Sequence, residues 1–223
     1  MKKFFLFIAC ATFSTMLLAQ NSIKEDFEAN SLEWTEYTYG NYTAQITKGN
    51  LRILSTRSPY LGTNEAVIVA QIIEALFTPP VPSHYHRISE SHCFAPIDVQ
   101  KPFTIRALLK PTVQLSSDNS VGILFNYRDA ANYYCIAVNQ NGVRFCRYEN
   151  GKLVGFEECP MIPKKMSNVM MSWELKKDGD FLLFSIEGTE YLKIRYAPME
   201  YRGFGFFAFE GGALIVEEVE FIQ

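Results

Sequence analysis

The chain has 223 residues, of which 48% are hydrophobic and 14% aromatic, and a formal net charge of −3 at pH 7. That length suits one large all-β domain, and no linker, repeat or low-complexity tract divides the sequence. The mildly acidic, dispersed charge excludes the basic footprint of a nucleic-acid-binding protein. No basic amphipathic stretch predicts attachment to a membrane surface either.

The first residues have the build of a secretory signal peptide. Lys2 and Lys3 precede an apolar run over residues 4–11, and small and apolar residues continue to Ala19. Cleavage after Ala19 would leave residues 20–223 as the mature domain, exported to the periplasm, the cell surface or the medium. A retained membrane anchor needs about 20 apolar residues. We therefore expect no membrane insertion after cleavage.

Short β-branched and aromatic runs alternate with Gly, Asn and Asp turns, which is typical of strands. Asn141-Gly142 lies between two alternating runs and predicts a hairpin, and Asn150-Gly151 predicts the next turn. We expect strands at residues 22–27, 42–47, 51–55, 103–110, 121–128, 133–138, 143–148, 170–175, 181–186, 204–209 and 214–222. Turns at this spacing indicate an antiparallel sandwich or barrel.

Residues 61–91 interrupt this rhythm. Within them, residues 65–77 have apolar residues at both helical and strand spacing, so a short helix and a strand both stay open. Long loops on rigid scaffolds often hold binding residues. We expect this segment to carry the protein's individual function if its apolar run is exposed. If the run folds down, it would only cover an open end of the sandwich.

Four cysteines follow the signal peptide, and export permits disulfides between them. They are Cys93, Cys135, Cys146 and Cys159, and four cysteines allow three pairings. A four-residue loop over 139–142 places Cys135 opposite Cys146, within disulfide range. A two-residue loop at 141–142 makes them diagonal neighbours instead. We expect a disulfide between these two, or two free thiols in contact.

Several runs resemble the concanavalin-A-like lectin/glucanase superfamily, which includes laminin-G-like and 3-keto-disaccharide hydrolase-like domains. They are Gly122-Ile123-Leu124-Phe125, Asp129, Asn132-Tyr133-Tyr134, the Asn-Gly hairpin, Arg147-Tyr148, Phe204-Gly205-Phe206-Phe207-Ala208 and Val216-Glu217-Glu218-Val219. The resemblance implies an all-β jelly roll of two antiparallel sheets. It leaves the function open, because fold does not imply function.

Catalytic and metal-binding patterns are weak. The glucanase branch carries a Glu-x-Asp-x-x-Glu strand, which this sequence lacks. Glu218 and Glu220 share a strand face, as an acid and base pair would, but an acidic cluster on a last strand is also a common solvated edge. His84, His86 and His92 suit a metal by ligand type, yet fit a solvent-facing loop as well. We predict no catalytic residue, no metal and no cofactor.

Ligand-binding candidates come from two patterns. Trp34 and Tyr39 belong to an aromatic-rich start of the mature chain; such rings stack on sugars or simply fill a core. Alternation along the strands turns Arg106, Asn126 and Arg144 away from the core. The resemblance implies that the outer face of the concave sheet is the carbohydrate surface, and it makes these three residues the polar candidates.

The sequence predicts an exported, non-catalytic binding module for a glycan such as a polysaccharide, or for an envelope or extracellular protein. One alternative is a glycoside hydrolase or a related carbohydrate-active enzyme. Another is a structural or interaction subunit of an envelope assembly that uses residues 61–91 as its contact surface.

The signal peptide yields the first testable prediction. Mass spectrometry of the amino terminus of the exported protein should find that it begins at Gln20, because small residues precede the cleavage position. A retained Met1 would contradict the interpretation.

Overall fold

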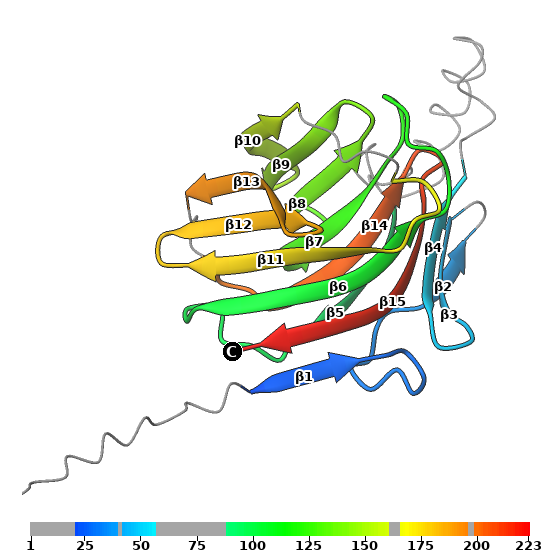
Figure 1. Cartoon of the computed structure of the whole chain (residues 1–223), viewed down its shortest axis with the longest axis horizontal. Helices are drawn as coiled ribbons and strands as arrows, with labels where there is room; N and C mark the ends of the chain where they lie inside the picture. Colours follow the sequence, from blue (N-terminus) through cyan, green and yellow to red (C-terminus); the bar gives the residue numbers. More distant parts are fainter. Residues whose placement is uncertain (1–20, 40–41, 57–87, 161–165, 196–198) are drawn as a thin grey trace, which may run out of the picture.

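The computed structural model describes residues 21–39, 42–56, 88–160, 166–195 and 199–223. Within these ranges the chain forms fifteen strands and no helix, and the strands assemble into two antiparallel sheets that face each other (Figure 1). The predicted all-β fold of two antiparallel sheets is therefore confirmed. Residues 1–20, with the expected signal peptide, lie outside the described part, so its cleavage stays a prediction.

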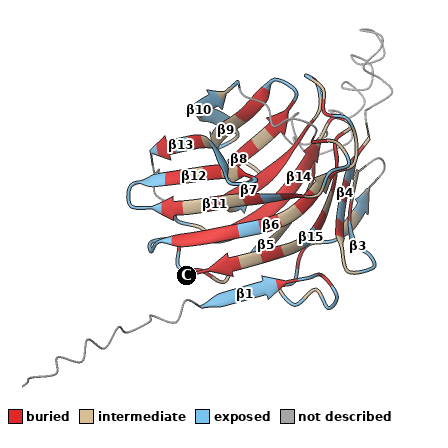
Figure 2. Cartoon of the chain, viewed as in Figure 1, coloured by how far each residue is buried: buried red, intermediate tan, exposed pale blue. Residues whose placement is uncertain are grey.

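The larger sheet has nine strands. Along the sheet they are β13 (Thr189–Arg195), β12 (Phe181–Ile186), β11 (Met171–Asp178), β6 (Phe103–Pro111), β15 (Ala213–Ile222), β4 (Leu51–Ser55), β3 (Tyr42–Ile46) and β2 (Tyr37–Tyr39). The ninth strand, β1 (Ser22–Glu25), pairs with β15 and is mostly exposed (Figure 2).

The smaller sheet has six strands. Their order is β10 (Lys152–Cys159), β9 (Gly142–Glu149), β8 (Asn132–Asn139), β7 (Ser120–Asp129), β14 (Gly203–Phe209) and β5 (Ile88–Phe94). Neighbours that are distant in sequence, such as β7 and β14, show that the chain passes back and forth between the two sheets, as in a jelly roll.

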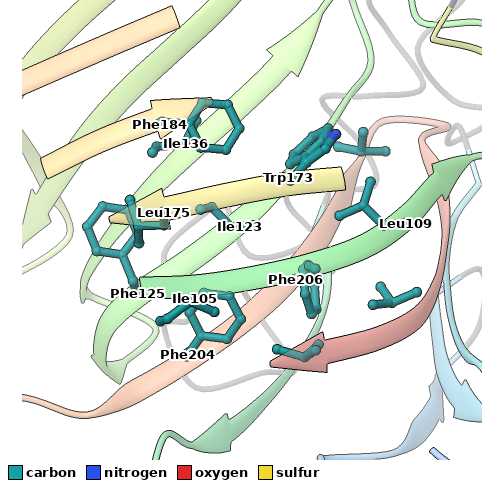
Figure 3. Close-up of a cluster of buried hydrophobic side chains, with 14 of the residues drawn as sticks. Ile105, Leu109, Ile123, Phe125, Ile136, Trp173, Leu175, Phe184, Phe204 and Phe206 are labelled. Carbon is teal, nitrogen blue, oxygen red and sulfur yellow. The ribbon is translucent and has the colours of Figure 1, made fainter. Parts of the chain in front are cut away.

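The hydrophobic core lies between the sheets and follows the alternation of side chains along each strand. On β7, Ile123 and Phe125 point inward, and they meet Trp173 and Leu175 from β11 (Figure 3). Apolar residues from both sheets make this cluster continuous. Burial of this apolar surface is the main force that holds the two layers together.

Four strands were not predicted from the sequence: β2, β5, β10 and β13. Strand β5 corrects the view that residues 61–91 form one long loop, because Ile88 begins a regular strand. Its buried positions include Ser89 and Ser91, whose hydroxyls donate to the backbone oxygens of Leu54 and Thr35 at 2.6 and 2.7 Å. Residues 57–87, including 65–77, lie outside the described residues.

The β8–β9 hairpin has the register in which Cys135 faces Cys146. Both thiols are free, as are Cys93 and Cys159, so the expected disulfide is not found and the alternative of two thiols in contact holds. A hydrogen bond between the two thiols, together with burial, raises the pKa of Cys135. The same bond lowers the pKa of Cys146.

Glycines on the outer face of the six-stranded sheet make room for rings. A Cβ on Gly122 would lie 2.1 Å from the backbone oxygen of Ile136 and 2.5 Å from the ring of Phe207. A Cβ on Gly205 would lie 2.8 Å from the Cβ of His92. The missing side chains therefore let large rings lie close over the strands.

This packing predicts that Gly122→Ala destabilises the protein. Forcing a methyl group into a filled space costs about 1–3 kcal/mol, which lowers the Tm by several degrees in a chain of this size. The matched control is Gly155→Ala on β10, where the nearest atom to a new Cβ is a side-chain carbon of Arg147 at 3.3 Å. Equal Tm values for both variants and the parent would show that the ring of Phe207 does not pack closely against Gly122.

Candidate functional site

The outer face of the six-stranded sheet has a hydrophobic cluster of its own, separate from the core. Leu124, Tyr133, Cys135 and Phe207 form it, and each is less than 8% exposed. Leu124 and Cys135 thus point away from the core between the sheets. Because both faces of the sheet are packed, this side has fixed side-chain positions of the kind that a binding site requires.

A row of four rings crosses this face from β5 to β9. The rings of His92 and Tyr127 have centroids 4.4 Å apart, those of Tyr127 and Tyr133 are 6.3 Å apart, and Tyr133 stacks on Tyr148 at 4.9 Å. The rings therefore turn their faces mainly toward one another. The row therefore presents ring edges and hydroxyl groups to a ligand.

Glu90, on β5, is bound to this row. The hydroxyl of Tyr127 donates to Glu90 Oε1 at 2.7 Å, and the backbone N–H of Glu90 donates to the hydroxyl of Tyr37 at 2.7 Å. Burial raises the pKa of the Glu90 carboxyl, and the Tyr127 hydrogen bond offsets only part of that effect. Burial likewise lowers the pKa of His92.

A cavity of about 290 Å³ opens at one end of this sheet. Its lining comes from the end of β7, the start of β8, the end of β9 and the connector before β14. The side chains that line it include Asn132, Tyr148, Glu149, Glu200 and Tyr201. Amide, phenol and carboxylate groups therefore converge on one space.

Asn126 positions the connector that forms one wall. A bulge interrupts the pairing of β7 with β8, and Asn126 has a positive φ of 48°. Its side-chain oxygen accepts hydrogen bonds from the backbone N–H groups of Glu200 and Tyr201, at 2.9 and 2.8 Å. Asn tolerates this backbone region better than most residues.

Two linked turns brace the part of the lining that β8 and β9 supply. Asp129 Oδ1 accepts from the backbone N–H of Ala131 and from the side chain of Asn132, both at 2.8 Å. Asn132 in turn accepts from the backbone N–H of Asn150 at 3.0 Å. Burial alone would raise the pKa of Asp129, but these hydrogen bonds and nearby Arg128 outweigh it and lower the pKa. The carboxylate thus fixes Asn132, which lines the cavity.

Two arginines at the cavity lie over aromatic rings. The guanidinium of Arg147 is 5.5 Å from the ring centroid of Tyr134, and its Nε donates to Glu149 Oε1 at 2.8 Å. The guanidinium of Arg128 is 5.6 Å from the ring centroid of Tyr201. These contacts hold long, flexible side chains in set orientations.

The structure separates the three polar residues that the sequence proposed together. Asn126 lines the cavity. Arg144 is on β9 of the same sheet, where its Nε lies 2.8 Å from Glu158 Oε1. Arg106 is on β6 of the nine-stranded sheet and pairs with Glu174 at 2.8 Å. The outward direction was readable from alternation, but the sheet to which each strand belongs was not.

The other candidates also take distinct places. Trp34 lies in the core, 2% exposed, and stacks on Phe206 at 5.5 Å. Tyr39 ends β2 opposite Tyr42, and its side chain lies outside the described part, as do His84 and His86. His92 belongs to strand β5, which corrects its assignment to a loop.

Glu218 and Glu220 lie on the last strand of the nine-stranded sheet. Glu218 forms an ion pair with Lys24 at 2.6 Å, and Glu220 accepts from the hydroxyl of Ser22 at 2.6 Å. Both carboxylates therefore have partners on the neighbouring strand β1, on the surface of the sheet. Neither residue lines the cavity.

Most of the cavity residues were missed as functional candidates. Tyr133, Tyr134 and Tyr148 were quoted only as marks of the fold. The Asn-Tyr-Tyr and Arg-Tyr pairs beside two turns were the available signal. Glu200 and Tyr201 have no such signal, because the connector that carries them shows no periodic pattern.

Among the residues that the structure describes, no group of three or more His, Cys, Asp or Glu side chains is arranged to hold a metal ion. In the same ranges there is no helix of the length and apolar character that a membrane span needs.

No protein-family model matches the chain, and no curated protein matches it in sequence. Solved structures match in fold. A β-glucanase of Bacillus licheniformis is 12% identical with a TM-score of 0.57, over 90% of this chain and 97% of that one. The carbohydrate recognition domain of Emp47p is 15% identical with a TM-score of 0.58, over 91% and 94%. The carbohydrate-binding module CBM66 from Bacillus subtilis is 15% identical with a TM-score of 0.51, over 83% and 94%.

These identities are too low to show more than the fold. The chain has the two-sheet jelly-roll fold of these structures, which is the fold that the resemblance in its sequence implied.

The raised pKa of Glu90 predicts a pH-dependent stability. A carboxyl with a raised pKa in the fold contributes stability that is complete below its ordinary value of 4.5 and is lost as pH rises through the folded value. Glu90→Gln keeps an oxygen for the Tyr127 hydroxyl but cannot ionise. We expect it to raise the Tm by a few degrees at pH 7.5 and to leave it unchanged at pH 4.

Thermal melting of both proteins across this pH range measures the effect. Glu157→Gln, at an exposed position on β10, is the matched control and should match the parent at every pH. If Glu90→Gln were equally stable or less stable than the parent at pH 7.5, ionised Glu90 would not destabilise the fold.

Proposed function

We propose that this chain is an exported glycan-binding module that holds a sugar in the cavity at the end of the six-stranded sheet. The observation that carries the proposal is the convergence of amide, phenol, carboxylate and guanidinium groups on one space of about 290 Å³. That volume is at the lower end of the range of small-ligand sites, about 300–1,000 Å³.

The chemistry of the lining favours a polyhydroxylated ligand. Sugar hydroxyls both donate and accept, so they match sites that present donors and acceptors side by side. Glu200 and Glu149 offer acceptors, Asn132 and Arg147 offer donors, and Tyr148 can do both. Solved structures of the same fold include a carbohydrate-binding module and a carbohydrate recognition domain, which supports the proposal at the level of ligand class.

The cavity also favours a second candidate function, glycoside hydrolysis. Two carboxylates, Glu149 and Glu200, line the same space, and hydrolases use a pair of carboxylates as acid and base or nucleophile. A β-glucanase and a lichenase are among the solved structures of this fold. Binding without turnover would distinguish a module from an enzyme.

Contact with an envelope protein through residues 61–91 is a separate proposal. It rests on the sequence, because residues 57–87 lie outside the described part of the chain.

A panel of purified polysaccharides and oligosaccharides, screened by calorimetry and by release of reducing ends, tests the proposal. We expect binding without release. Glu200→Ala removes an exposed carboxylate from the cavity wall and should weaken affinity at least fivefold, about 1 kcal/mol, with the Tm unchanged.

The matched control is Glu190→Ala, at an exposed position on β13 of the other sheet, which should bind like the parent. Release of reducing ends that Glu149→Gln or Glu200→Gln abolishes would establish the hydrolase instead. Equal affinity of Glu200→Ala and the parent would move the site away from the cavity.

A further inference from the structure

At the cavity end of the six-stranded sheet, a third arginine lies over an aromatic ring, in addition to Arg128 and Arg147. The third is Arg202, whose guanidinium lies 4.1 Å from the ring centroid of Phe94. Arg202 directly follows Tyr201 of the cavity wall, and its backbone oxygen accepts from the N–H of Ala95 at 2.8 Å. This bond fixes the backbone of Arg202 beside Ala95, the residue after Phe94. The pair therefore lies next to the cavity wall along the chain, although neither side chain lines the cavity itself.

The Phe94–Arg202 pair differs from the other two in its exposure and its charge. Phe94 is 63% exposed, although most phenylalanines of the described chain are buried. Arg128 lies 3.4 Å from Asp129, and Arg147 is paired with Glu149. Within the described residues, the guanidinium of Arg202 has no ion pair or hydrogen bond, only its contact with Phe94. Its positive charge therefore has no ion-pair partner among the described residues.

A guanidinium held over an aromatic ring is positioned to bind an anion. The ring contact limits the rotamers of Arg202, so less side-chain entropy is lost when a ligand binds. The N–H groups of arginine lie in the plane of the guanidinium and form a fork that fits a carboxylate or sulfate with two parallel hydrogen bonds. The same guanidinium covers one face of Phe94, the face that a neutral sugar would need for stacking.

We infer that the glycan held by this protein is anionic, and that Arg202 binds a carboxylate or sulfate on the sugar next to the one in the cavity. The inference rests on the proposed glycan-binding function and specifies its ligand class. Glu149 and Glu200 do not oppose it, because they line the cavity itself and would accept hydrogen bonds from the hydroxyls of the first sugar.

The test compares three sets of oligosaccharides of equal length: uronate oligomers, sulfated oligomers and neutral oligomers. Calorimetry with the mature protein at low salt should show at least tenfold tighter binding to one of the anionic sets than to the neutral set. The set that binds identifies carboxylate or sulfate as the recognised group. Raising the salt to 0.5 M should remove most of the preference, because the Arg202 site is exposed and salt screens its charge.

Variants test whether Arg202 is the source of the preference for anionic oligomers. Arg202→Gln should reduce affinity for the anionic set about tenfold and leave affinity for neutral oligomers unchanged. Arg202→Lys keeps the charge without the planar fork and should fall between the two. Arg106→Gln, at an exposed arginine on the other sheet, is the matched control and should bind like the parent.

A preference for neutral oligomers, or an anionic preference that survives in Arg202→Gln, would overturn the inference and leave the glycan-binding function standing. Absence of binding to all three sets by the parent protein would overturn both.

Discussion

The side-chain amide of Asn126 joins the parts from which the cavity is built. Its oxygen accepts hydrogen bonds from two successive backbone N–H groups of the connector, those of Glu200 and Tyr201. Asn126 is 9% exposed and its two hydrogen bonds are partly buried, so loss of this acceptor would cost about 0.5–1.5 kcal/mol for each bond. The positive φ of Asn126 belongs to the same bulge, beyond which β7 carries Tyr127 and Arg128 toward the site. Asn126 thus links the bulge in β7 to the position of the connector before β14.

The six-stranded sheet is packed on both faces, and this distinguishes it from a simple cover over the core. Inward residues such as Phe125 meet the other sheet, while Leu124 and Phe207 belong to a second cluster outside. Strand β7 is accordingly buried along Val121 to Asn126. A layer fixed from both sides is a rigid base for the ring row and for the arginines at its end. Residues that contact a ligand are held in more precise positions when the elements that support them are rigid.

Much of the fold could be predicted from local signals. The Asn-Gly turns and the alternation around them located β8 and β9, and one of the two registers left open has Cys135 facing Cys146, as the structure does. Strand β5 was missed because two of its three buried positions are serines, and β10 was missed because its residues show no alternation of buried and exposed positions. Alternation also told which way Arg106 and Arg144 point. It could not tell that β6 joins the other sheet, since strand order depends on contacts distant in sequence.

The site was less predictable than the fold for a related reason. A ring row and a guanidinium over a ring depend on side chains from different strands, and no spacing within one strand records them. Asn126 was selected as a polar residue on the outward face and does line the cavity, yet its visible role is to hold the connector. Arg202 and Tyr201 lie in a segment without periodicity, so only the three-dimensional arrangement reveals them.

The central claim is that the ligand surface is the cavity end of the six-stranded sheet. Nuclear magnetic resonance with labelled protein, titrated with the tightest-binding oligosaccharide, measures this directly. The account predicts that amide shifts concentrate at residues 126–134, 147–151 and 199–203 and that those of β6 and β11 stay unchanged. Shifts concentrated around Arg106 and Glu174, on the outer face of the nine-stranded sheet, would contradict it.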